Sequence, residues 1–146
     1  MFIYDKKLQY PVKIDTPNPK LAAIIISQYG GPDGELGASL RYLSQRYSMP
    51  FDELKGLLTD IGTEELGHLE MVGTLVYQLS DGATGKDWLN GHTPEYYADN
   101  GNAVFPQNAQ GSPFNAAAIA STGDPITNLF EDLAADGAIT QGQQNY

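Results

Sequence analysis

The stretch GTEELGHLEM, residues 62–71, places two polar side chains where a helix that faces a protein interior normally carries apolar ones. It lies inside a helical pattern that begins at Ser48 or Pro50 and ends before Gly82, with core-facing positions at alternating steps of three and four. These positions are Leu58, Ile61, Glu65, His68, Val72, Leu75 and Leu79. A carboxylate in the middle of such a row is costly to bury unless it is paired or binds a metal.

Glu65 and His68 stand three residues apart, so their side chains can meet on one helix face. Glu-x-x-His projecting into a helical bundle is the ligand pattern of di-iron and dimanganese carboxylate proteins. The alternative is a buried histidine that bonds a glutamate, both satisfied by protein neighbours. A short connection should pack this helix antiparallel to the preceding one, which brings Glu35 to the same region. Tyr42 is then either an outer hydrogen-bond donor or an ordinary core tyrosine.

The whole chain fits one all-α domain, residues 1–146. We expect an extended arm over residues 1–16 and a helical hairpin over 17–80. The first helix starts at Asn18, breaks at GGPDG (30–34) and resumes to about Tyr47. Its resumed part carries an apolar stripe. That stripe is Leu36, Leu40, Leu43 and Tyr47.

The second half of the chain has a different character. Residues 81–123 are rich in Gly, Asn, Pro and aromatic residues without a period, which is typical of a functional loop or an assembly arm. A third helix is predicted over 124–136, where Gly137 should end it, followed by a polar tail over 137–146. The apolar face expected for this helix is Ile126, Leu129, Phe130 and Leu133.

Composition excludes several classes of function. The net charge of −10 disfavours nucleic acid, which needs clustered basic residues. The absence of cysteine excludes disulfides and thiolate metal sites. No segment reaches the length of a membrane span, and the N-terminus has no apolar run typical of a signal peptide. Carboxylate and imidazole ligands together suit manganese or iron.

Four segments resemble the manganese catalases, and most of all their short spore-coat branch. These are KLQYPVK (7–13), QYGGPDGE (28–35), LRYLSQRY (40–47) and LLTDIGTEELGHLEM (57–71). The resemblance covers roughly residues 4–136. It implies a ferritin-like bundle with two manganese ions per complete site, iron being possible, that converts hydrogen peroxide to water and oxygen. It also implies a cytoplasmic or spore-coat location.

Carried over position by position, the resemblance implies Glu35, Glu65 and His68 as metal ligands. Glu65 would bridge the metals and Tyr42 would be the outer-sphere tyrosine, so these two carry the catalytic assignment. Asp136 stands where family members carry a ligand glutamate, and is one methylene shorter. The fourth helix, with the second histidine ligand, has no counterpart in the pattern, and loop residue His92 is more typical of a surface histidine.

About three core helices therefore form a partial bundle that we expect to be completed by a homo-oligomer through the helical row. Two copies of Glu35, Glu65 and His68 would supply four carboxylates and two imidazoles. Two other interpretations stay open. One is a structural subunit of a layer, shell or filament that keeps the fold without the activity. The other is a truncated or frameshifted catalase gene.

Overall fold

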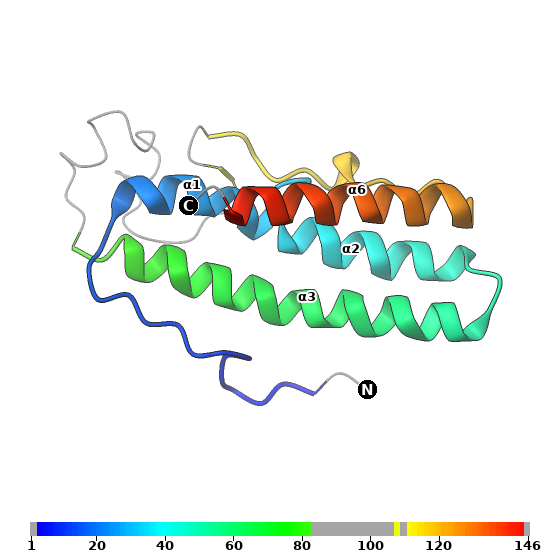
Figure 1. Cartoon of the computed structure of the whole chain (residues 1–146), viewed down its shortest axis with the longest axis horizontal. Helices are drawn as coiled ribbons and strands as arrows, with labels where there is room; N and C mark the ends of the chain where they lie inside the picture. Colours follow the sequence, from blue (N-terminus) through cyan, green and yellow to red (C-terminus); the bar gives the residue numbers. More distant parts are fainter. Residues whose placement is uncertain (1–2, 83–106, 109–110, 145–146) are drawn as a thin grey trace.

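The computed structural model describes residues 3–82, 107–108 and 111–144, and the regular secondary structure within these is helical (Figure 1). The helices are α1 (Pro19–Gly30), α2 (Glu35–Gln45), α3 (Asp52–Leu79) and α6 (Pro125–Gln144), with short 3-10 turns at Arg46–Ser48 and Ala116–Ala118. Apart from one isolated bridge between Gln107 and Pro113, the described residues form no β-structure. The expected all-α class is confirmed.

The helix boundaries follow from local chemistry. Asn18 caps α1, because its side chain accepts a hydrogen bond from the Leu21 N–H, and Pro19 occupies the first position. Asp52 and Glu53 place negative charge in the first turn of α3, where it interacts favourably with the helix dipole and stabilises the helix. Gly82 follows the end of α3 with φ of +69°, a conformation that glycine adopts at low cost.

The GGPDG break lets α1 and α2 follow one another along the same side of α3. Figure 1 shows both running antiparallel to it. The bend is tight: a Cβ on Gly37 would lie 2.7 Å from the Gly31 carbonyl oxygen, so only glycine fits there. Two apolar clusters hold the layer, one between α1 and α3 and one between α2 and α3. The first cluster consists of Ala22, Ile26, Val76 and Leu79. The second consists of Ala38, Tyr42, Met49 and Leu58.

The face of α2 that packs inward differs from the predicted one. In the expected stripe, Leu40 and Tyr47 are exposed. The buried positions carry small and polar residues instead: Glu35, Gly37, Ala38, Ser39, Arg41, Tyr42 and Gln45. Small side chains let α2 approach α3 closely, and the Ser39 hydroxyl donates to the Gly62 carbonyl at 2.6 Å. Close helix approach, rather than apolar content, therefore decides which face is buried.

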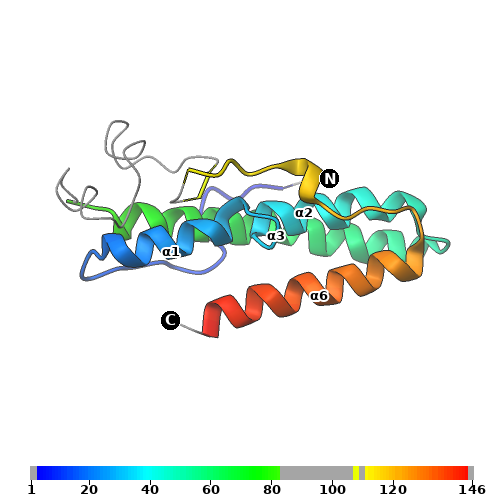
Figure 2. The same cartoon turned by 90° about the horizontal axis from the view of Figure 1, so that it is seen from above.

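Helix α6 also departs from expectation in two ways. It continues to Gln144 and is not ended by Gly137, because a helical glycine costs only about 1 kcal/mol relative to alanine. Its predicted apolar face is the exposed one, with Ile126, Phe130 and Leu133 each more than two-thirds accessible. The helix instead turns Asn128, Asp132 and Ala135 inward. Figure 2 shows α6 lying beside the layer formed by the other helices.

Over residues 3–18 the N-terminal segment forms no helix or strand, and it runs along α3 (Figure 1). Three points tie it down. Tyr4 donates to Glu70 at 2.6 Å, Gln9 donates to Glu64 at 3.0 Å, and Gln78 bonds the backbone of Val12 and Ile14. Most of the irregular 81–123 segment, with His92, lies outside the described residues. None of the described helices is long and apolar enough to cross a membrane.

Candidate metal centre

The central turn of α3 brings Glu65 and His68 together. His68 Nδ1 lies 2.7 Å from Glu65 Oε2, the contact that a spacing of three residues predicts. The side chain of Glu65 is 13% exposed and that of His68 is 33% exposed. The pair therefore faces the α2 side of the helix with one edge open to solvent.

Glu35 completes the group from the first residue of α2, immediately after the glycine-rich bend. Its side chain is 6% exposed, and its Oε2 lies 3.7 Å from His68 Nδ1. One ligand atom from each of Glu35, Glu65 and His68 lies within 4.8 Å of the other two. The predicted convergence of these three side chains is therefore what the structure contains.

The electrostatics of this group favour a cation. Burial, followed by the hydrogen bond and negative charge of neighbouring Glu65 and a smaller contribution from Asp136, together raise the pKa of Glu35 to about 8. Two buried carboxyl groups that face each other cannot both ionise cheaply. A divalent ion between them would supply the missing positive charge.

Tyr42 and Asp136 form a second contact beside this group. The Tyr42 hydroxyl donates to Asp136, with both carboxylate oxygens at 2.8 Å. Burial, followed by this bond to a carboxylate, raises the pKa of Tyr42, so its proton stays on the hydroxyl. Asp136 is not among the three residues that converge within 4.8 Å. Its role as a ligand remains a prediction.

Sequence reasoning missed a buried polar cluster between α2 and α6. Arg41 and Asp132 are each 5% exposed and Gln45 is fully buried. Burial raises the pKa of Asp132 to about 6, while Gln45 and Arg41 pull it down. Arg41 also donates to the Pro32 carbonyl and Gln45 to the Ala120 carbonyl. The signal was present in the spacing, because Asp132 lies one helical turn before Asp136.

Comparisons with known proteins agree with this geometry. The family model for manganese containing catalase matches residues 1–144. The chain belongs to the manganese catalase family. Protein CotJC of Bacillus subtilis is 54% identical over 136 residues, which cover 93% of this chain and 71% of that protein. A probable manganese catalase of Clostridium acetobutylicum is 33% identical over 138 residues, covering 93% and 61%.

The fold of a solved manganese catalase matches as well. KatB from Anabaena superposes with a TM-score of 0.88 at 30% identity, covering 99% of this chain and 65% of KatB. This confirms the ferritin-like fold. The chain thus spans less than two thirds of that manganese catalase and of the Clostridium relative.

Membership of the manganese catalase family implies a dimanganese cofactor, and the residues present fit part of such a site. Glu35 and Glu65 offer carboxylate oxygens and His68 offers an imidazole nitrogen, a donor set suited to manganese. A complete ferritin-like site takes four carboxylates and two imidazoles. The three convergent side chains therefore correspond to half of the ligand set.

Proposed function

We propose that this manganese catalase family member disproportionates hydrogen peroxide, two molecules giving two of water and one of oxygen. The observation that carries the proposal is the convergence of Glu35, Glu65 and His68 within 4.8 Å. A bound manganese pair would supply the two-electron redox capacity that this reaction needs. The other functions of the site would be carried out by side chains of this chain.

Each side chain has a distinct part in the proposed site. Glu35 and Glu65 would provide carboxylate oxygens to the metal, and Glu65 Oε2 already lies 2.7 Å from His68 Nδ1. His68 offers Nδ1, the ring nitrogen turned toward both acids. Tyr42 keeps its proton and holds Asp136 in place. The partly exposed edge at His68 gives a small substrate such as peroxide a way in.

The second half of the ligand set is proposed to come from a second copy of the chain. Ile126, Phe130 and Leu133 form a row on α6, with exposed fractions of 68, 68 and 69%. Apolar surface of this kind is costly in water and is typical of an interface. A second copy whose own Glu35, Glu65 and His68 met the first set would give the full complement of a ferritin-like site.

Oxygen release from peroxide tests the activity directly. The Mn²⁺-loaded protein should evolve oxygen, and Glu65→Ala should lose both the activity and the bound manganese. Glu53→Ala, which changes an exposed acid at the start of the same helix, is the control and should retain both. Manganese-loaded protein that evolves no more oxygen than Glu65→Ala would contradict the proposed reaction.

A structural role is the alternative, as a subunit of a layer, shell or filament such as a spore coat. Large apolar side chains favour it, because Tyr47, Phe51 and Tyr77 are each more than 60% exposed in addition to the row on α6. This role would be supported over catalysis if Glu65→Ala assembled like the wild type and neither protein released oxygen from peroxide.

A further inference from the structure

The imidazole of His68 has a second neighbour that the metal ligands do not account for. Its Nδ1 faces Glu65 and Glu35, so the opposite nitrogen, Nε2, points away from the metal group. Glu64 Oε1 lies 3.9 Å from that Nε2. A histidine that binds metal through one ring nitrogen is neutral and carries its proton on the other, which then needs an acceptor.

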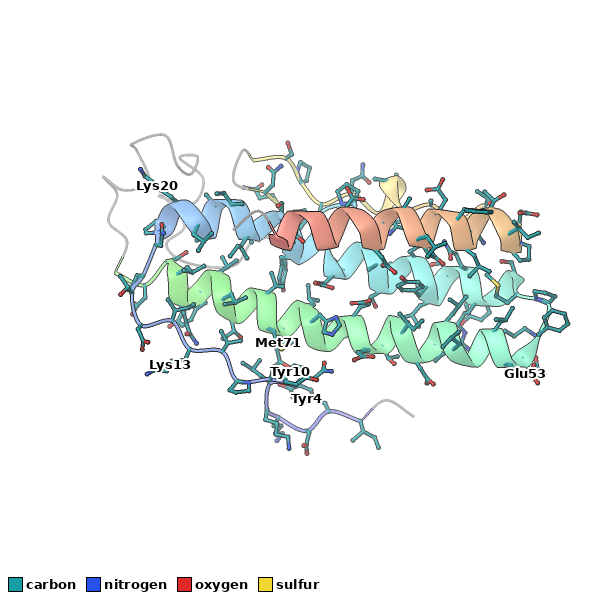
Figure 3. The ribbon with its side chains drawn as sticks, viewed as in Figure 1. Tyr4, Tyr10, Lys13, Lys20, Glu53 and Met71 are labelled. Carbon is teal, nitrogen blue, oxygen red and sulfur yellow. The ribbon has the colours of Figure 1, made fainter. Side chains whose placement is uncertain are left out.

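The N-terminal arm restrains the side chain of Glu64. Gln9 Nε2 donates to the same Oε1 atom of Glu64 at 3.0 Å. Tyr4 anchors the arm to Glu70, nearly two turns further along α3, and Figure 3 shows Tyr4 and Tyr10 lying beside that helix near Met71. A cavity of about 520 Å³ between the arm and α3 borders Gln9 and Glu64.

Gly67 makes this approach of the arm feasible. A Cβ built on Gly67 would lie 2.8 Å from Gln9 Oε1, so the amide group of Gln9 would have to move. An alanine at this position would therefore disturb the contact between Gln9 and Glu64 without changing any predicted metal ligand. The glycine between Glu64 and His68 thus serves the arm contact, since a helix interior does not otherwise favour glycine.

We infer that Glu64, held by Gln9 of the N-terminal arm, is a positioning residue that accepts the Nε2–H of His68 and orients its Nδ1 toward the metal. This inference rests on the proposed manganese site. The arm is then part of the metal centre. Displacing the arm would leave His68 less well oriented, although the arm is linked to His68 only through Glu64. Outer partners of ligating histidines typically contribute a factor of about 10 to 100 in metal affinity.

The test is the dissociation constant for Mn²⁺, measured by calorimetry on the whole chain. Glu64→Gln should bind about tenfold more weakly than the wild type. Gln9→Ala and Gly67→Ala should bind more weakly as well, by a smaller factor. Gly56→Ala is the matched control, since a Cβ on this glycine of the same helix meets nothing within 4 Å, and should bind like the wild type.

A spectroscopic readout separates positioning from a general loss of structure. In protein loaded with Zn²⁺ as a diamagnetic probe, the Nε2–H proton of His68 should resonate downfield, and move upfield in Glu64→Gln. His92→Asn assigns the signal, because the chain has two histidines. Equal Mn²⁺ affinity and an unmoved signal in Glu64→Gln would overturn the inference. A wild type that binds no Mn²⁺ would instead overturn the metal site on which it rests.

Discussion

At the scale of single residues, the main feature of this chain is a buried carboxyl group that faces a second acid. Glu35 is 4% exposed and faces Glu65, and its pKa is raised to about 8, first by burial and then by that neighbour. A metal-free protein must either keep Glu35 protonated or accept the repulsion. The metal site and the stability of the fold are therefore linked through one side chain.

This link predicts how the metal-free protein responds to pH. Because the folded-state pKa of Glu35 lies above its usual value of 4.5, the folded protein binds more protons between about pH 4.5 and 8, and stability falls as pH rises through that window. In chelator, the Tm should be several degrees lower at pH 8 than at pH 5.5. Glu35→Gln should flatten this difference, and an equal difference in that variant would rule Glu35 out as its source.

Tyr42 allows its two interpretations to be separated. Its hydroxyl bonds a carboxylate in a buried setting, so Tyr42→Phe should lower the free energy of unfolding by about 1–3 kcal/mol. Tyr47→Phe, on the exposed side of the chain, should cost almost nothing and serves as the control. Chemical denaturation measures both. If Tyr42→Phe is as stable as the wild type, Tyr42 is only a core tyrosine.

At the scale of helices, the packing of α2 against α3 decides where the ligands lie. The two helices approach closely at Gly62, where a Cβ would lie 2.8 Å from the Leu43 side chain and 3.1 Å from Tyr42 Cβ. Gly62 lies one turn before Glu65, so the spacing of the helices at this point sets the position of Glu65 relative to Glu35. Small residues on both helices thus determine the geometry of the metal group.

A pair of glycine substitutions tests this packing. Gly62→Ala should destabilise the protein by about 1–3 kcal/mol, because the added methyl group forces α2 and α3 apart. Gly56→Ala, where the same atom meets open space, should instead stabilise α3 by up to about 1 kcal/mol. Thermal or chemical unfolding gives both values. A neutral Gly62→Ala would show that the contact can relax without cost.

The sequence predicted the inner face of α3 and failed on α2 and α6 for one physical reason. On α3 the buried row is mostly apolar, so Leu58, Val72 and Leu79 reveal it by periodicity. On α2 the inward face holds Ala38, Ser39 and Gln45, which a search for apolar stripes passes over. Helix α6 turns Asn128 and Asp132 inward in the same way. Glu65 and His68 were found because their spacing lies within α3, and Glu35 followed from the expected antiparallel packing of α2 against α3.

At the scale of the whole molecule, the exposed row on α6 predicts self-association. Phe130 is 68% exposed, so Phe130→Glu should leave the monomer folded while placing a charge in the proposed interface. Sedimentation should show a dimer or larger species for the wild type and a monomer for the variant. Tyr77→Glu changes a residue of similar exposure, 62%, near the end of α3, and should associate like the wild type. Monomeric wild-type protein would contradict the pairing.

Manganese content together with electron paramagnetic resonance of the purified, Mn²⁺-loaded protein tests the shared site most directly. Two half-sites that meet across a two-fold axis predict about one manganese per chain, with the spectrum of a spin-coupled pair. Glu65→Ala should lose both the coupling and the metal. Fewer than about one manganese per two chains, or a spectrum of isolated ions alone, would contradict a dimanganese centre built from Glu35, Glu65 and His68.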